Sequence, residues 1–328
     1  SKNASYSEAA SKVILLKGTA KGKTEINLSW NKISGATKYT LHTAKLGGKT
    51  TATSIAKTKT SYTVKKWNKK KLAKNTIYKF VLKAYKGKTQ LASSKLIYLI
   101  TSGYRGKYSN TTKVKASSSA VSLRVGYTKT ITAKLTQYKN KKAYKGVTYL
   151  SSDPSVATVS SNGKITGITR GFASIYAIAP NGIYATTKVT VYNINYTIKF
   201  DANAPAGKFV GVMQSIKMTS NTQKALPTNT FVRPGYTFLG WSTDKNATGI
   251  TYLNESKVNN LTKKHGDTII LYAVWMMGKA NDYKEEGSLG EKKYDVQNIP
   301  GKHAMNYVDT AGNTLTDYKF TYPTGDGR

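Results

Sequence analysis

Residues 232–241 read Val-Arg-Pro-Gly-Tyr-Thr-Phe-Leu-Gly-Trp, a short stretch that combines a turn with the beginning of a β-strand. Pro234 and Gly235 are residues that β-turns prefer, because proline fixes φ and glycine accepts a positive φ. Tyr236 and Phe238 then alternate with other side chains at a period of two, which is typical of a strand. The stretch therefore predicts the start of the core of a small β-module.

A second run, residues 268–275, reads Thr-Ile-Ile-Leu-Tyr-Ala-Val-Trp and is almost wholly β-branched, aliphatic or aromatic. Such a composition predicts a strand that is covered on both faces. Gly240, in the first run, allows the backbone to pass close beside the bulky Trp241. We expect the two runs to share one core, to which four aromatic side chains belong: Tyr236, Phe238, Trp241 and Trp275.

Further motifs follow a fixed order around these runs: Tyr-Thr-Ile-Lys-Phe-Asp-Ala-Asn at 196–203, Leu-Pro-Thr-Asn at 226–229, Gly-Ile-Thr-Tyr at 249–252 and Val-Asn-Asn-Leu-Thr at 258–262. Together they resemble the Listeria-Bacteroides repeat, a family of short β-grasp-like modules on bacterial surface proteins. In this sequence Ala204, Pro205 and Ala206 replace the glycines that usually follow Asp-Ala-Asn, and a longer loop comes next. The resemblance predicts a β-grasp-like domain over residues 195–277.

The N-terminal part of the sequence alternates apolar and polar residues at a period of two. Residues 13–16 and 25–30 predict two strands, and a glycine turn leads into another. With the run Asn-Thr-Ile-Tyr-Lys-Phe-Val-Leu-Lys-Ala-Tyr at 75–85 they resemble a fibronectin type III domain, which we place at residues 1–103. The alternation points Trp30 inward, so we expect a core tryptophan; the alternative is an exposed tryptophan that stacks on sugars.

A second β unit follows a short linker at residues 103–110. Its centre reads Ser-Asp-Pro-Ser-Val-Ala-Thr-Val at 152–159 and Asn-Gly-Lys-Ile-Thr-Gly at 162–167, and a Gly-x-Ala-x-Ile pattern begins at Gly171. The Asn-Gly pair is a strong hairpin signal between alternating runs, and the Asp-Pro pair predicts a turn. The order of these motifs resembles the group 2 bacterial immunoglobulin-like domain of surface adhesins such as intimins, and we place this domain at residues 104–194.

These units predict a mostly β protein in which tandem β-sandwich domains precede a small β-grasp-like module. A length of 328 residues accommodates two or three domains, and 24 tyrosines with only 7 prolines favour strands. Residues 278–328 resemble none of these families. Their scattered apolar residues indicate two or three strands, for instance 304–308 paired with 316–322, in either a truncated further domain or a tether.

The residues that are absent or scarce bear on compartment and anchoring. The sequence contains no cysteine, which excludes a disulfide framework, a thiolate metal site and a cysteine nucleophile. The longest apolar run, residues 269–277, is far shorter than the roughly 20 residues that span a bilayer. No signal peptide is visible at Ser1, so we expect an excised interior or mature fragment without membrane insertion. The family resemblances imply an extracellular location, secreted or on a bacterial cell surface, as in Gram-positive bacteria.

Positive charge is the most unusual property of the sequence. The formal net charge is +37, from 52 Lys and Arg residues against 15 Asp and Glu residues. It falls along the chain, from +20 over residues 1–103 and +13 over 104–192 to +5 over 193–278 and −1 over 279–328. Nearly all the basic residues are lysines, which sense charge density, whereas the bidentate reader arginine is scarce. The composition therefore favours diffuse attraction to polyanions over reading of a base sequence.

Two groups of lysines surround aromatic residues and are the candidate polyanion-binding residues: Lys65, Lys66, Lys69, Lys70, Lys71 and Lys74 around Trp67, and Lys139, Lys141, Lys142 and Lys145 around Tyr138 and Tyr144. The simpler interpretation is a solvated face that keeps the protein soluble. The expected partners are host or cell-wall glycans, teichoic acids or other polyanions, and host surface proteins. We expect no sequence-specific nucleic-acid binding and a monomeric chain.

The sequence offers little material for catalysis. His42, His265 and His303 lie in three different parts of the chain and form no metal-binding spacing, and we expect no metal or cofactor. Residues 1–192 contain only three carboxylates, which argues against glycosidase chemistry and leaves Glu25 as the one strand carboxylate for a Lys-Asn isopeptide bond. Acidic residues of the tail offer oxygen ligands for calcium, without an EF-hand loop.

These observations predict a non-catalytic stalk or adhesin region of a bacterial cell-surface protein, which presents other domains or mediates adhesion and attracts polyanions. The alternative is a carbohydrate-binding or scaffold region that accompanies a larger secreted glycan-degrading enzyme. Neither alternative is settled by fold resemblance, because function depends on the sites that a fold carries.

Overall fold

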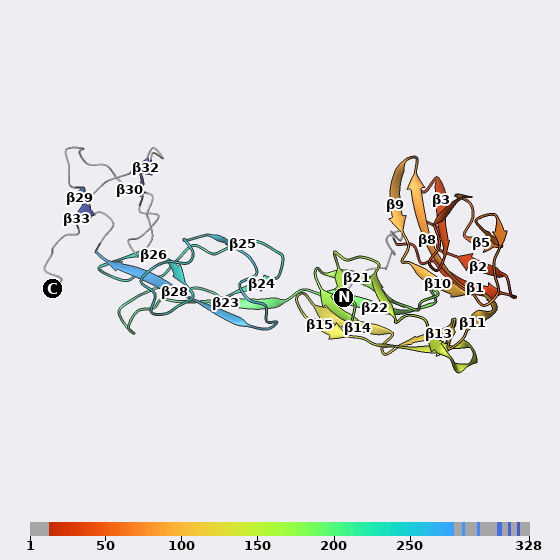
Figure 1. The fold of residues 1–328 in the computed structure, drawn as a ribbon. Helices are drawn as coiled ribbons and strands as arrows, with labels where there is room; N and C mark the ends of the chain where they lie inside the picture. The colour runs from red at the N-terminus through yellow and green to blue at the C-terminus, as the bar shows by residue number, and fades with distance from the viewer. Residues whose placement is uncertain are drawn as a thin grey trace. The chain divides into compact units, whose positions relative to one another are not determined.

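The structure, a computed structural model, describes residues 13–278 and, beyond them, the backbone of five short strands at 284–285, 294–295, 307–309, 314–315 and 320–321 (Figure 1). The described residues form strands and two short 3₁₀ turns, η1 (Thr101–Gly103) and η2 (Tyr138–Asn140), without an α-helix. This confirms the prediction of a mostly β protein built from tandem β-sandwiches. The chain divides into two compact units, residues 1–192 and 193–328, which are described separately.

The first domain is a sandwich of two antiparallel sheets. Its strands are β1 (Lys17–Lys21), β2 (Glu25–Ser29), β3 (Lys38–Lys45), β4 (Thr51–Ala56), β5 (Ser61–Val64), β6 (Lys66–Trp67), β7 (Lys70–Lys71), β8 (Ile77–Lys86), β9 (Thr89–Ser93) and β10 (Ile97–Ile100). One sheet has the order β1-β2-β5, and the other has β10-β8-β3-β4 with β9 also on β8. Alternate residues of β2 and β8 are buried, so the period of two in the sequence places the core between the sheets. Trp30 is buried in that core.

Residues 13–16 differ from the prediction of a strand, since β1 begins at Lys17. Ile14 and Leu16 are nevertheless buried in the first core, while Leu15 belongs to a separate apolar cluster with residues of the next domain. The side chain of Asn31 takes the place of a partner strand: its Oδ1 accepts from the Leu15 amide at 2.7 Å and its Nδ2 donates to the Val13 carbonyl at 2.9 Å. An apolar run predicts burial here, but a side-chain amide replaces the sheet ladder.

The second domain contains four small sheets, and two of them, β14-β22-β21-β18 and β15-β20-β19, enclose its core. Its strands are β11 (Tyr104–Arg105), β12 (Tyr108–Ser109), β13 (Thr111–Ala116), β14 (Ala120–Arg124), β15 (Thr128–Thr130), β16 (Ala133–Gln137), β17 (Lys142–Ala143), β18 (Thr148–Ser151), β19 (Ala157–Val159), β20 (Lys164–Gly167), β21 (Gly171–Ile178) and β22 (Tyr184–Tyr192). The sheets have the orders β14-β22-β21-β18, β15-β20-β19, β13-β16 and β11-β12-β17. The Asn-Gly hairpin joins β19 to β20, as the sequence predicts. The Asp-Pro pair lies in a turn, where Asp153 Oδ1 accepts from the Ser155 amide at 3.0 Å.

Residues 103–110, expected as a short linker, form the paired strands β11 and β12. Asn110 is buried, and its side chain binds the backbone of Ile100 twice: Oδ1 accepts from the amide at 2.9 Å and Nδ2 donates to the carbonyl at 2.8 Å. The Asn110 amide also donates to the Gly103 carbonyl at 2.9 Å. This segment therefore holds the end of the first domain against the start of the second.

The two domains of the first unit share further contacts, which we call the domain joint. The Gly18 amide donates to the Asn181 carbonyl at 2.9 Å, and the Tyr98 amide donates to the Pro180 carbonyl at 2.7 Å. Leu15 packs in one apolar cluster with Tyr176 and other residues of β18, β21 and β22. The short linker expected from the sequence gives no sign of these contacts, which couple the two sandwiches.

The second unit begins with a four-stranded mixed sheet and a two-stranded antiparallel sheet, β25-β27. Its strands are β23 (Asn195–Asp201), β24 (Ile216–Thr219), β25 (Lys224–Ala225), β26 (Tyr236–Ser242), β27 (Lys257–Val258) and β28 (Thr268–Met277). The order is β24-β23-β28-β26, in which the first and last strands, β23 and β28, are parallel neighbours at the centre. A central parallel pair of this kind is the strand arrangement of a β-grasp, here without a helix in residues 195–277.

The core of this module contains the aromatic residues that the sequence singled out. Trp241 is fully buried, with the Phe238 ring centroid 4.9 Å away, whereas Tyr236, Phe238 and Trp275 are half-buried. The β26–β28 register shifts at Gly240, where an added Cβ would lie 2.6 Å from the Tyr252 carbonyl oxygen. β28 is covered on both faces only over residues 271–276, because Thr268, Ile270 and Met277 are exposed.

Five short strands are described beyond residue 278: β29 (Lys284–Glu285), β30 (Tyr294–Asp295), β31 (Tyr307–Asp309), β32 (Thr314–Leu315) and β33 (Phe320–Thr321). β31 pairs with β30 and β32, and β29 pairs with β33. The expected pairing of 304–308 with 316–322, and the candidate calcium ligands of the tail, fall largely on residues or side chains outside the described part.

Candidate polyanion interface

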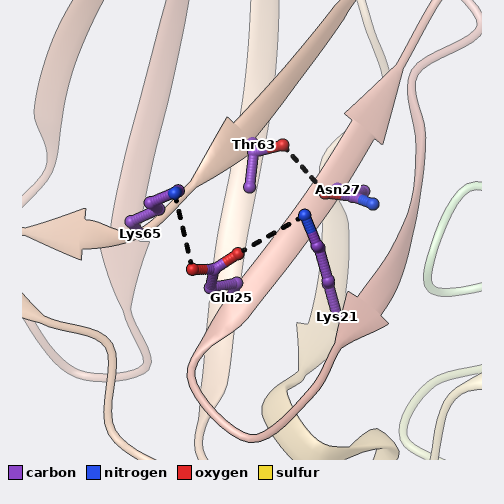
Figure 2. A network of polar contacts seen from close by, with 5 residues as sticks. All are labelled: Lys21, Glu25, Asn27, Thr63 and Lys65. Carbon is purple, nitrogen blue, oxygen red and sulfur yellow. Dashed lines mark hydrogen bonds and ion pairs between the residues drawn. The ribbon is translucent and has the colours of Figure 1, made fainter.

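The first unit has almost no negative charge to balance its lysines. Residues 13–192 contain 34 basic side chains and two carboxylates, Glu25 and Asp153. Glu25 lies on β2 between two lysines, with Oε2 3.8 Å from Lys21 Nζ and Oε1 3.6 Å from Lys65 Nζ (Figure 2). Both lysine side chains are more than half exposed, so these pairs are weak and screened by salt. The surface of this unit therefore carries a nearly uncompensated positive field.

Residues 65–74, which we call the lysine hairpin, present the first predicted lysine group. Strands β6 and β7 pair across a turn in which Asn68 and Lys69 both have positive φ, 48° and 63°. Two positive φ values in a two-residue loop are those of a type I′ turn, whose second position usually holds glycine. Lysine at this position lacks the conformational freedom of glycine, and its exposed side chain projects at the tip.

Two apolar side chains fix the base of the lysine hairpin. Leu72 is 1% exposed, and Trp67 packs against the first core with its ring edge-on to Tyr78 at a centroid distance of 6.4 Å. The Trp67 Nε1 donates to the Lys49 carbonyl at 3.2 Å, and an added Cβ on Gly48 would lie 2.7 Å from the Trp67 ring. Trp67 is therefore a packing residue, and the six exposed lysines around it are the accessible part.

A groove opens beside the lysine hairpin, between the edges of the two sheets. Strands β4 and β5 each end a sheet and do not pair with each other. The space between them has a volume of about 560 Å³. Its floor includes Leu41 and Val64, its walls carry threonines and Tyr62, and the lysine hairpin contributes Lys65, Lys66 and Lys69. Half of the first predicted lysine group is thus brought to one concave surface.

The second predicted lysine group lies at the domain joint and contacts tyrosine rings. Lys139 Nζ is 4.5 Å from the Tyr104 ring centroid, Lys141 Nζ is 5.5 Å from the same ring, and Lys145 Nζ is 5.4 Å from the Tyr144 ring. These are cation–π distances. The remaining member of the group, Lys142, belongs to β17, which pairs with β12 of the former linker.

The tyrosines below these lysines pack with one another. The Tyr144 ring lies between Tyr98 and Tyr108, with centroid distances of 5.3 and 5.4 Å, and Tyr104 lies 6.5 Å from Tyr138. Tyr98 comes from β10 of the first domain, whereas Tyr138 and Tyr144 belong to the second. The cluster therefore joins the two domains. Of the two aromatic residues that the sequence singled out beside these lysines, Tyr138 is exposed and Tyr144 is half-buried.

The described residues offer few groups for metal binding or for catalysis. Within residues 13–278, no three histidine and carboxylate side chains converge on a possible metal position. His42 on β3 has a lowered pKa, because burial disfavours its charged form and Lys83 repels it. In the part of the chain that the structure describes, no helix is long and apolar enough to cross a membrane.

Two stretches match known families. Residues 110–191 match the bacterial Ig-like domain (group 2), and residues 196–274 match the Listeria-Bacteroides repeat domain. Both kinds of domain are typical of extracellular bacterial surface proteins and are typically non-catalytic. No curated protein matches the chain.

Solved structures with fibronectin type III domains are also similar to part of the chain. The chicken CNTN1 FN1-FN3 domains match with a TM-score of 0.25 and 18% identity, covering 29% of this chain and 32% of that chain. The FN5 domain of Drosophila Lar gives 0.24 and 20%, covering 29% and 98%. A Fn3-like protein from Clostridium thermocellum gives 0.23 and 26%, covering 26% and 86%. This chain thus spans about a third of the first of these proteins.

The strand orders, the two family matches and the motif order agree on the domain types. A sandwich in which β1-β2-β5 faces β10-β8-β3-β4 is followed by the stretches at 110–191 and 196–274. The chain is a multi-domain β protein in which a sandwich of two sheets precedes a stretch that matches the bacterial Ig-like domain (group 2) and a stretch that matches the Listeria-Bacteroides repeat domain.

Proposed function

We propose that this chain is a stalk or adhesin region of a bacterial cell-surface protein whose first unit attaches to polyanions. Teichoic acids, acidic glycans of a capsule and sulfated host glycans are the polyanions that such a surface meets. The chain has no catalytic role in this proposal. Its sandwiches carry the basic surface that makes the contact.

The observation that carries the proposal is the charge of residues 13–192. This segment forms two coupled sandwiches and contains 34 basic side chains but only two carboxylates. Solubility requires far less net charge than this. Each anionic group that a lysine neutralises releases a bound counterion, so binding to a polyanion gains free energy at low salt and loses it at high salt. The accessible lysines of the lysine hairpin are the first candidates for this contact.

The test is a titration of the whole chain against heparin, teichoic acid and single-stranded DNA of matched charge at two salt concentrations. We expect all three to bind, with a loss of about tenfold or more in affinity between 50 mM and 200 mM salt. A variant with Lys69, Lys70, Lys71 and Lys74 changed to Gln should weaken all three together. Absence of binding at 50 mM salt, or binding of one neutral glycan without salt dependence, contradicts the proposal.

A further inference from the structure

We infer that the groove between β4 and β5 is a binding site for an acidic polysaccharide. The chain of the polysaccharide runs along the groove, a sugar ring contacts Tyr62, and its carboxylates or sulfates contact Lys65, Lys66 and Lys69. This inference rests on the proposed polyanion attachment and assigns it to one site and one class of ligand.

The groove has the size and the lining of a ligand site. Its volume of about 560 Å³ lies within the ~300–1,000 Å³ that small-molecule sites occupy. It exists because β4 and β5 end different sheets, so the outward-facing backbone groups along both strands are not used in a β ladder with each other. Leu41 and Val64 close the bottom of the groove and belong to the core, with exposed fractions of 1% and 3%. A bound chain therefore makes its contacts mainly with the side chains and backbone groups of the walls.

Tyr62 supplies the aromatic contact. The register of β2 and β5 pairs Leu28 with Tyr62 and Ile26 with Val64, and Ile26, Leu28 and Val64 all face the core. Tyr62 thus points to the inner face of its sheet, yet its side chain is 38% exposed because the groove is open at this position. One exposed ring suits stacking on a sugar, since amphipathic aromatics combine an apolar face with a polar tip.

Hydroxyl groups of the walls supply polar contacts. Thr51 and Thr53 on β4 line the groove and are half-buried. Thr51 donates to the Thr43 carbonyl, so its hydroxyl keeps lone pairs that accept from a sugar. A polysaccharide presents many hydroxyl donors and acceptors at this spacing, whereas a simple polyphosphate presents acceptors alone.

The lysines supply the charge. Lys65 follows β5 directly, Lys66 belongs to β6, and Lys69 occupies the tip of the turn with its positive φ. Lys66 and Lys69 bring two exposed ammonium groups to the lining of the groove, and Lys65, which alternates with the inward Val64 and has its Nζ 3.6 Å from Glu25, adds charge at its rim. Such a lining selects for a chain that carries both sugars and negative charge. Nucleic acids favour several successive aromatic platforms, and within the groove lining Tyr62 is the one aromatic residue. An acidic peptide that adds a strand to β4 or β5 is the other occupant to be tested.

The experiment compares two triple variants of the whole chain that lose the same charge. In one, Lys65, Lys66 and Lys69 become Gln; in the other, the exposed Lys86, Lys88 and Lys95, which do not line the groove, become Gln. Affinity for a heparin oligosaccharide is measured by calorimetry at 150 mM salt. We expect a loss of about tenfold for the groove variant and less than about threefold for the control. Equal losses of heparin affinity in the two variants overturn the inference, because diffuse attraction to the whole charged surface would then explain the binding.

Two uncharged variants separate the sugar from the charge. Tyr62→Ala should lower affinity for the heparin oligosaccharide about fivefold and leave affinity for polyglutamate unchanged. Tyr192→Ala removes a tyrosine that is 49% exposed elsewhere on the first unit and is the control. Thr53→Val keeps the shape of a half-buried wall residue and should lower heparin affinity about threefold without a change in thermal stability.

The outcomes distinguish this inference from the proposed function. If no polyanion binds, the proposed function fails. If polyanions bind but Tyr62→Ala and Thr53→Val bind heparin as well as Tyr192→Ala does, the polysaccharide site fails and the general attraction stands. If both changes weaken polyglutamate as much as heparin, the occupant is a peptide strand and the inference is wrong.

Discussion

The lysine hairpin and the lysines of the domain joint have similar sequences and different surroundings. Each group places several lysines within a few residues of an aromatic side chain. In the lysine hairpin, Trp67 packs into the core below and leaves its lysines without a ring contact in the described structure. At the domain joint, Lys139, Lys141 and Lys145 each lie over a tyrosine ring. One group is thus available to a ligand, while the other takes part in holding two domains together.

This difference teaches that a charge cluster acquires its role from the aromatic beside it. An aromatic that points into its own domain removes itself from the surface and leaves the cations to solvent. An aromatic at a boundary between domains offers its π face to the same cations, which contributes about 0.5 to 1 kcal/mol at an exposed site. The following predictions test the domain joint first and the lysine hairpin afterwards, from the largest expected effect to the smallest.

Gly182→Ala should be the most damaging change at the domain joint. Gly182 has φ +84°, and an added Cβ would lie 2.1 Å from the Leu16 carbonyl oxygen, so either the turn or the first domain must move. We expect a loss of about 3 kcal/mol or more in the free energy of unfolding, measured by urea denaturation.

Gly126→Ala is the matched control. Gly126 has φ +81° and nothing within 4 Å of an added Cβ, so the change costs only the backbone strain of about 1 kcal/mol. Equal losses for Gly182→Ala and Gly126→Ala would show that the contact with Leu16 is absent in solution. The inference that these contacts hold the two domains together would then be wrong.

Asn181→Ala should have the next largest effect. Asn181 is 1% exposed, and its Nδ2 donates to the Thr111 carbonyl at 2.9 Å and to the Gly18 carbonyl at 3.3 Å. Removal of the side chain leaves both carbonyls without this donor, which costs about 1 to 3 kcal/mol. Asn181→Asp keeps the size and replaces the donor with a carboxylate, so its loss should be at least as large. A tolerated Asn181→Asp argues that the donors have no role.

The sequence predicted the cores better than the contacts between domains. Alternation at a period of two placed Trp30 inward because neighbouring strand residues face opposite sides, a rule that needs no knowledge of the partner sheet. Asn181 and Gly182 form the same Asn-Gly signal as the hairpin at 162–163, and nothing local distinguishes them. Their partners, Gly18 and Leu16, lie more than 160 residues earlier, so only the assembled structure reveals their role.

The candidate site was predicted in its lysines and missed in its groove. Runs of lysine are visible in any sequence, whereas the groove depends on two sheet edges, β4 and β5, that remain unpaired. Tyr62 offered one signal: its position in a short alternating strand predicts an inward side chain. Its 38% exposure could not be predicted, because it depends on where the opposite sheet ends.

Two quadruple variants compare the lysine groups directly, since each removes four charges. In the hairpin variant Lys69, Lys70, Lys71 and Lys74 become Gln, and we expect about a tenfold loss in heparin affinity at 150 mM salt with an unchanged melting temperature. In the joint variant Lys139, Lys141, Lys142 and Lys145 become Gln. Loss of the four cation–π contacts that Lys139, Lys141 and Lys145 make should destabilise the first unit by about 2 kcal/mol, with a smaller loss of affinity.

Calorimetric melting and the heparin titration measure both properties on the same samples. Suppose that the joint variant binds heparin as weakly as the hairpin variant and melts at the same temperature as the unchanged protein. Its lysines then belong to the binding surface. The distinction between the two groups would then be wrong.

Glu25→Gln should have the smallest effect and refines the role of the lysine hairpin. Glu25 is the one carboxylate in residues 13–103, and it lies within 4 Å of both Lys21 and Lys65. It therefore competes with any anion for Lys65. Its removal should raise heparin affinity about twofold at 50 mM salt, and the gain should vanish near 1 M salt, where the screening length is about 3 Å.

Asp153→Asn is the control, because it removes the same charge from the second domain and keeps a side-chain oxygen that can still accept from Ser155. An equal gain from Asp153→Asn means that only net charge matters. A loss of affinity on Glu25→Gln means instead that the Glu25 carboxylate orients Lys65 for its ligand. If the carboxylate only competed with heparin for Lys65, its removal could not weaken heparin binding.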